Sequence, residues 1–267
     1  MAGLAVQGVG VRFGGLTALE DVSFEVPPAS VVGVIGPNGA GKTTLFNVIS
    51  GFVRPTSGRL EWDGRALAPR PDRLVADGIA RTLQSVGLFE RLTTVENVMV
   101  GAARSRRAGF VSALFGLPRS DRDERRLRAE AMALLRRFDI ADEADRPAGT
   151  LPYPVQKRVA LARALIAHPR MLLLDEPAGG LGADDIDELG VLIRSMPTAE
   201  EPCSVLLVEH HMELVMAVCD QVVVLDFGRR VAAGTPEEVQ ADPAVATAYL
   251  GAEVPPAGQP AVSGEAS

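Results

Sequence analysis

The residues best suited to chemistry form "GPNGAGKT" at residues 36–43, where two glycines separated by four residues precede a lysine and a threonine. Glycines let a backbone curl closely around phosphate groups, and amides at the start of a following helix point toward negative charge. Lys42 would then neutralise the outer phosphates of a nucleotide, and Thr43 would ligate magnesium. A glycine-rich turn with an unrelated lysine is the alternative, but the motif follows an apolar run and precedes a helical pattern. The sequence therefore predicts a nucleotide site.

An acidic pair, Asp175 and Glu176, ends a second apolar run at residues 171–174. Beside a phosphate loop, such a strand would bring Asp175 close to the magnesium, and Glu176 could orient or deprotonate the attacking water. By itself the pair would indicate only a buried strand followed by an acidic turn. Together with the phosphate loop it favours hydrolysis over binding alone, and it leaves phosphoryl transfer to a small acceptor open.

The elements that must position these residues alternate between strands and helices, which predicts a parallel α/β sheet. Residues 4–35 alternate apolar and polar positions and are broken by glycine and proline, so short strands are expected there. Residues 93–144 are helical in character, and the charged, amphipathic segment at 121–138 predicts a solvated face. The apolar runs typical of buried strands lie at residues 31–35, 171–174, 204–209 and 221–226.

Composition narrows the classes of protein that this chain can belong to. The chain has 267 residues, of which 47% are hydrophobic, and a formal net charge of -7. That charge argues against a general nucleic-acid coat. Cys203 and Cys219 lie in apolar surroundings without metal-like spacing, which predicts small core residues of a reduced, cytosolic protein. We expect no secretion signal and no membrane span, and we expect residues 252–267, rich in proline, alanine and glycine, to be disordered.

Several further motifs follow one another in a recognisable order. Gln84 ends "GIARTLQ", a helical block comes next, "LPYPVQKRVALARAL" precedes the acidic pair, and "VEHHM" contains His210. Gln84 or His210 alone would more often be a structural residue. In this order, the motifs resemble the ATP-binding subunit of an ABC transporter over residues 4–251. The resemblance implies a P-loop NTPase core with a mixed sheet and flanking helices, an inserted α-helical subdomain at about 87–165, and an antiparallel β subdomain.

The resemblance also implies roles for individual residues. Phe13 would stack on adenine, and Gln84 would sense the γ-phosphate and magnesium. Asp175 would be the magnesium-associated carboxylate, Glu176 the catalytic base, and His210 a contact to the γ-phosphate. The implied ATP-binding set is Phe13, Gly36, Pro37, Asn38, Gly39, Ala40, Gly41, Lys42, Thr43 and Thr44. The implied catalytic set is Lys42, Gln84, Glu176 and His210, and the implied Mg²⁺ set is Thr43, Gln84 and Asp175.

The chain departs from the family at the signature stretch, which usually reads Leu-Ser-Gly-Gly-Gln and here reads Leu-Pro-Tyr-Pro-Val at residues 151–155. In such families two subunits sandwich two ATP molecules, and each signature faces the partner's γ-phosphate. Here Pro152 removes the hydroxyl group, and Pro154 removes a backbone donor and adds bulk, although proline is tolerated in the first turn of a helix. In the segment that matches the family's D-loop, "GGLG" at residues 179–182, Gly182 also stands where the family usually has an acidic or amide residue. We predict an asymmetric dimer with one weak or silent ATP site; the alternative is that both sites turn over.

Finer resemblance points to the ATPases of branched-chain amino acid importers. It rests on "VRFGGLTAL", "GPNGAGKTTLFNVISG", "EPAGGL" and the stretch from "VEHHM" to "AYLG", in which His211 stands for a more usual Asp. Such importers combine two different ATPase subunits, integral membrane permeases and an external binding protein, and this subunit would lie peripherally on the cytoplasmic face of the membrane. Alternatives are an amide or urea importer, a lipopolysaccharide-type exporter, a non-transport ABC ATPase acting on ribosomes or DNA, or a regulatory module that only holds ATP.

Overall fold

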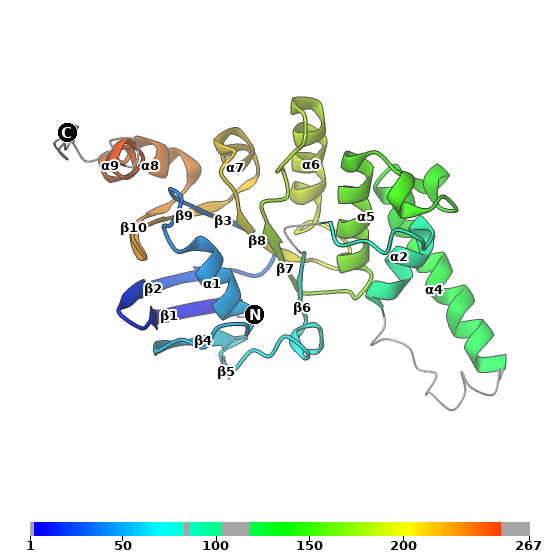
Figure 1. Cartoon of the computed structure of the whole chain (residues 1–267), viewed down its shortest axis with the longest axis horizontal. Helices are drawn as coiled ribbons and strands as arrows, with labels where there is room; N and C mark the ends of the chain where they lie inside the picture. Colours follow the sequence, from blue (N-terminus) through cyan, green and yellow to red (C-terminus); the bar gives the residue numbers. More distant parts are fainter. Residues whose placement is uncertain (1–2, 83–85, 103–117, 252–267) are drawn as a thin grey trace, which may run out of the picture.

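The computed structural model describes residues 3–82, 86–102 and 118–251, and its centre is a six-stranded sheet in the order β10-β9-β3-β8-β7-β6 (Figure 1). Five neighbouring strands run parallel, and β10 pairs antiparallel with β9. Its strands are β3 (Val31–Ile35), β6 (Ile79–Arg81), β7 (Met171–Asp175), β8 (Ser204–Val208), β9 (Gln221–Asp226) and β10 (Arg229–Gly234).

The central strands are continuously apolar because both faces of this sheet are buried. Successive side chains of a strand point to opposite faces. Leu172 and Leu174 of β7 therefore join one core cluster, whereas Met171 and Leu173 join the other. The strands β3 and β8 divide their residues between the same two clusters.

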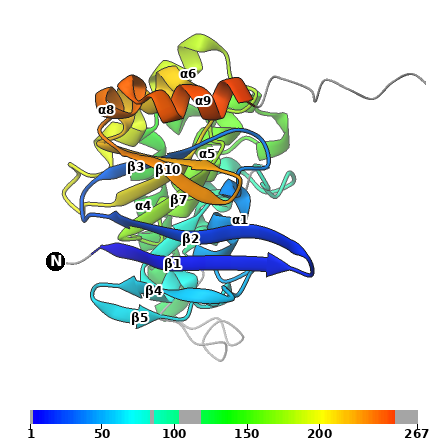
Figure 2. The same ribbon diagram turned by 90° about the vertical axis from the view of Figure 1, so that its left-hand side faces the viewer.

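A second, antiparallel sheet lies beside the first, in the order β2-β1-β4-β5 (Figure 2). Its strands are β1 (Leu4–Phe13), β2 (Leu16–Val26), β4 (Ser57–Trp62) and β5 (Arg65–Leu67). The helix α1 (Lys42–Ile49) lies between the two sheets, and its buried Leu45, Phe46 and Val48 share one apolar cluster with residues of both. This packing fixes the start of α1, and with it Lys42, at the edge of the central sheet.

Helices cover the other face of the central sheet and extend beyond one end of it. The helices α2, α4 and α5 pack together at that end (Figure 1). The helix α2 begins with a capping box between Thr93 and Glu96, which satisfies amides at the helix start. The helices are α2 (Thr94–Gly101), α4 (Pro118–Arg137), α5 (Tyr153–Leu165), α6 (Ala183–Ser195), α7 (Met212–Val218), α8 (Pro236–Ala241) and α9 (Pro243–Gly251), with single 3₁₀ turns at η1 (Leu74–Asp77), η2 (Ala141–Glu143) and η3 (Ala148–Thr150).

The expected fold class is confirmed, with differences of detail. Residues 4–26 form two long strands rather than several short ones, because β1 and β2 pair through irregular register shifts that absorb their glycines and polar residues. The sheet is not wholly parallel, since the turn at Phe227 and Gly228 is too short for a crossover and returns β10 beside β9. Gln84 and residues 252–267 lie outside the described residues. Within the described ranges, no helix combines the length and apolarity needed to cross a membrane.

Candidate nucleotide-binding site

The phosphate loop leaves the central sheet at the end of β3 and turns directly into α1. Gly36 has φ +147°, and a Cβ there would lie 2.0 Å from the Leu225 carbonyl oxygen, so the loop can pass β9 only as glycine. Gly39 and Gly41 also have positive φ, +82° and +101°. The amide of Gly228 donates to the Ala40 carbonyl at 3.1 Å and ties the loop to the β9–β10 turn. The strand, glycine turn and helix therefore adopt the arrangement that a phosphate cradle requires.

Lys42 is buried at the first position of α1, where its Nζ donates to the carbonyl oxygens of Gly36 at 2.6 Å and Pro37 at 2.8 Å. Burial lowers the pKa of its ammonium group, and the nearby Glu176 carboxylate partly offsets this by raising that pKa. Thr43 is exposed beside it and Thr44 is half-buried. The loop thus holds one cation at its centre and a hydroxyl group at its edge.

Asp175 is buried at the end of β7, and sequence reasoning missed its partner. Arg81, the last residue of the adjacent strand β6, places its Nη2 2.8 Å from the Asp175 Oδ2. The Nη1 of Arg81 donates to Asn47 Oδ1 at 2.9 Å and to Ser50 Oγ at 2.6 Å, both on or next to α1. An arginine at the end of an apolar strand was the available signal. This guanidinium links the carboxylate of β7 to the helix that follows the phosphate loop.

Glu176 follows immediately in the left-handed backbone region, with φ +47°. Such a conformation is uncommon for a residue with a side chain and needs support from its surroundings. Its amide donates to the Val208 carbonyl at 2.9 Å, and the Lys157 Nζ donates to its carbonyl oxygen at 3.4 Å. The strand end, β8 and the helix α5 therefore all hold this residue's backbone.

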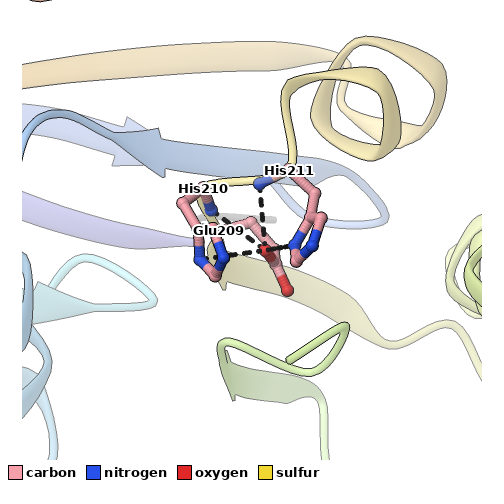
Figure 3. Close-up of side chains that lie close together, drawn as sticks. All are labelled: Glu209, His210 and His211. Atoms are coloured by element: carbon pink, nitrogen blue, oxygen red, sulfur yellow. Dashed lines mark hydrogen bonds and ion pairs between the residues drawn. The ribbon is translucent and has the colours of Figure 1, made fainter. Parts of the chain in front are cut away.

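His210 lies just beyond β8, next to a buried carboxylate that sequence reasoning also missed (Figure 3). Glu209 is fully buried, and it accepts hydrogen bonds from the Ala178 amide at 2.7 Å and the His210 amide at 2.9 Å. Its carboxylate also accepts from the His211 amide at 3.2 Å. The only sequence signal was a lone acidic residue ending an apolar run. Glu209 joins the turn after Glu176 to the turn that carries His210.

The signature stretch forms the start of α5, as predicted, with Pro152 preceding the helix and Pro154 in its first turn. No side chain caps this helix start. The Tyr153 ring lies against Gly180, where a Cβ would be 3.0 Å from a ring carbon, and the Lys157 Nζ lies 5.4 Å from the ring centroid. Both prolines are compatible with the helix, and neither replaces the hydrogen-bonding groups that they remove.

Two aromatic residues from opposite ends of the chain bear on the nucleotide site. Phe13, at the end of β1, is 51% exposed, as a ring available for stacking must be. Tyr249 of α9 is half-buried; its hydroxyl lies 3.9 Å from the Met212 sulfur, and burial raises the pKa of its phenol, partly offset by the Gly36 backbone. Sequence reasoning did not single out Tyr249. It docks the C-terminal helix beside the loop.

These residues converge because parallel strands end at one edge of the sheet. In the strand register, Val34 of β3 and Asp175 of β7 both lie opposite Val208 of β8. The phosphate loop follows β3, the acidic pair spans the end of β7, and His210 lies two residues beyond the end of β8. Gln84 lies outside the described residues, so its position relative to this edge is not described.

Comparison with known proteins gives the family. A family profile described as "ABC transporter" matches residues 19–179, which is more than half of the chain. The chain belongs to the ABC transporter ATP-binding family. A second profile, described as "Branched-chain amino acid ATP-binding cassette transporter", matches residues 229–255 of this ABC subunit.

The ABC subunit is similar to named relatives over nearly its whole length. It is 43% identical to the high-affinity branched-chain amino acid transport ATP-binding protein BraF of Pseudomonas aeruginosa, and 39% identical to LivG of Escherichia coli K12. Each match spans 93% of this chain and 97% of the relative. Among solved structures, the ADP conformation of MJ1267, an ATP-binding cassette of an ABC transporter, matches with a TM-score of 0.81 and 28% identity over 94% of this chain and 99% of that one. The subunit is therefore an ATP-binding, ATP-hydrolysing component of a transporter.

Proposed function

We propose that this ABC subunit powers the uptake of branched-chain amino acids. The observation that carries the substrate assignment is the match of residues 229–255 to the branched-chain amino acid transporter profile, supported by the similarity to BraF and LivG. The subunit would act peripherally on the cytoplasmic face of the membrane, bound to integral permease subunits that an external binding protein supplies. Residues 4–251 would form the cassette, and its helical subdomain at about 87–165 would contact the permeases.

The residues at the sheet edge would each have a separate role in ATP hydrolysis. The loop amides and Lys42 would bind the phosphates, and Phe13 would hold the adenine ring by stacking. Glu176, with its backbone fixed by β8 and α5, would orient or deprotonate the attacking water, and His210 and Gln84 would contact the γ-phosphate. Thr43 and Asp175 offer the oxygen ligands that Mg²⁺ prefers, and Arg81 engages one oxygen of Asp175. When bound, Mg²⁺ would neutralise charge that develops on the phosphates.

We further propose that the ATPase dimer is asymmetric, pairing this chain with a different ABC subunit. This chain supplies Lys42, Glu176 and His210 to one ATP site and the stretch containing Pro152 and Pro154 to the other. Each lost donor to a charged phosphate is worth roughly 1.5–3 kcal/mol, enough to weaken the second site by about tenfold or more. The site built on this chain's own phosphate loop would carry most of the turnover.

The test is ATP turnover of purified mixed dimers in which one subunit at a time carries a catalytic Glu→Gln change. Glu176→Gln in this chain should remove most of the activity, and the same change in the partner should remove little. The double substitution Pro152→Ser and Pro154→Gly in this chain should restore activity at the second site. If Glu176→Gln leaves most of the turnover intact, the assignment of the active site is wrong.

A second candidate has one observation in its favour. The chain is 32% identical over 87% of its length to the lipopolysaccharide export ATP-binding protein LptB of Haemophilus influenzae. The candidates should be separated by measuring the uptake of labelled leucine, urea and amides in cells whose only copy of this subunit carries Lys42→Ala. Loss of leucine uptake alone supports the proposal, whereas normal uptake of all three favours export. The membrane subunits that co-purify with the native chain provide an independent check.

A further inference from the structure

Two of the chain's three histidines are adjacent, and both contact one buried carboxylate. His210 and His211 flank Glu209, and one candidate ligand atom from each of the three lies within 4.8 Å of the other two. His211 stands where the resembled family usually carries an aspartate, so the three-ligand grouping adds to the role proposed for His210 in ATP hydrolysis. Figure 3 shows both imidazole rings turned toward the carboxylate.

Two of the three spacings in this group are close to those of a tetrahedral metal site, and the third is within 4.8 Å. Two ligands that bind Zn²⁺ at about 2.0–2.2 Å with tetrahedral angles are separated by about 3.3–3.6 Å. The Glu209 Oε2 lies 3.0 Å from the His211 Nδ1 and 3.7 Å from the His210 Nδ1, which brackets that separation. Small rotations of the two rings, which move each nitrogen by about a few tenths of an ångström, would bring both distances to the separation expected around Zn²⁺.

The chemistry of the cluster favours a transition metal over magnesium. Imidazole nitrogen suits Zn²⁺, Cu²⁺ and Ni²⁺, whereas Mg²⁺ prefers oxygen alone. The amides of Ala178 and His210 hold the Glu209 carboxylate in place, so one ligand is already fixed. The His211 side chain is 34% exposed and that of His210 is 56% exposed, so both can reach a metal that arrives from solvent.

We propose that Glu209, His210 and His211 form a binding site for a divalent transition metal, with Zn²⁺ as the reference ion, and that its occupancy inhibits ATP hydrolysis. The metal takes the place of the proton between the His211 Nδ1 and Glu209, and the imidazole stays neutral because, through exchange with solvent, Nδ1 gives up its proton and Nε2 carries one. Coordination then holds the His210 ring against Glu209 and away from the nucleotide. The inhibition rests on the proposed role of His210, whereas metal binding does not.

Binding is tested on the purified full chain without nucleotide, by Zn²⁺ competition against a chromophoric chelator and by the visible absorption of bound Co²⁺. We expect one ion per chain and the intense spectrum of a tetrahedral site. His211→Asn removes a ligand but keeps a side-chain donor for Glu209, and it should weaken binding at least about tenfold. His168→Asn is the matched control, because His168 forms an exposed pair with Glu201 at 2.6 Å and offers only two ligands. It should leave binding unchanged.

Binding that is equal in wild type and His211→Asn overturns the proposal, as does loss of binding in His168→Asn. Thermal unfolding of each variant establishes that it is folded, and His211→Gln replaces the asparagine variant if that one is not. The second measurement is ATPase activity of the assembled transporter with Mg²⁺-ATP in excess and Zn²⁺ titrated. Wild type should be inhibited, a zinc-selective chelator should reverse this, and His211→Asn should keep its basal activity and need at least about tenfold more Zn²⁺.

The two arms separate this proposal from the proposed function. Zn²⁺ that binds at this site without changing the ATPase activity refutes the inhibitory role. An assembled transporter that hydrolyses no ATP, but whose ABC subunit still binds Zn²⁺ through His211, refutes the proposed function and leaves the metal site standing.

Discussion

Replacing Arg81 should destabilise the fold strongly, because it would leave the carboxylate of Asp175 buried without its countercharge. The two side chains are 14% and 6% exposed, and the nitrogen and oxygen lie 2.8 Å apart. Removing one partner of a buried ion pair costs about 3–5 kcal/mol. For a protein of this size each kcal/mol lowers Tm by about 2–4 °C, so Arg81→Met should lower it by roughly 6–20 °C.

The assay is thermal unfolding followed by fluorescence of the single tryptophan, Trp62, which packs against the apolar cluster between the sheets. Asp175→Asn combined with Arg81→Met removes both charges and should recover part of the loss, so the two changes are not additive. The matched control is Arg229→Met, which breaks the exposed pair with Glu20 and should cost less than about 1 kcal/mol. A Tm within 2 °C of wild type for Arg81→Met, or strict additivity, would refute the reasoning; that threshold is about the effect of 1 kcal/mol.

Gly36→Ala should lower Tm far more than Gly39→Ala, since a Cβ meets backbone 2.0 Å away at Gly36 and nothing within 4 Å at Gly39; equal losses would rule out the steric cause. Burial raises the pKa of the Cys203 and Cys219 thiols to about 12 from 9.0, so folded thiols stay neutral where unfolded ones ionise. Unfolding free energy should therefore fall as pH rises above about 9, by roughly 1 kcal/mol per thiol at pH 10, and Cys→Ala variants should lose that part of the decline. Thr93→Ala removes the α2 capping box and should cost about 1 kcal/mol in chemical denaturation, whereas an unchanged midpoint would contradict that role.

Local sequence patterns were sufficient to predict three residues of the candidate site, Lys42, Asp175 and Glu176. Lys42 follows a glycine motif, and Asp175 and Glu176 end an apolar run, so each could be identified from its immediate neighbours. The buried runs were also predicted as strands, because a sheet covered on both faces needs continuous apolar segments. Strand lengths in residues 4–26 were not predicted, since the bulges that let β1 and β2 pair over their glycines depend on the partner strand.

Arg81 and Glu209 escaped prediction because their partners are distant in the sequence. Arg81 meets Asp175, 94 positions later, only because β6 and β7 are neighbours in the sheet. Glu209 meets the amide of Ala178, 31 positions earlier, because the turns after β7 and β8 lie side by side. Strand order decides both contacts, and the alternation of strands and helices leaves that order open. Tyr249 was missed because Met212 and Gly36, which it contacts, are also distant from it in the sequence.

In the proposed dimer, the contacts at the start of α5 would mechanically link the two surfaces of this subunit that would face nucleotide. Lys157 bonds to the carbonyl of Glu176, and Tyr153 rests on Gly180 in the next turn. A shift of the glutamate backbone during hydrolysis would therefore pull directly on the helix end that faces the neighbouring subunit. In the proposed asymmetric dimer, signalling across the interface would then survive even if the ATP site built on Pro152 and Pro154 hydrolyses no ATP.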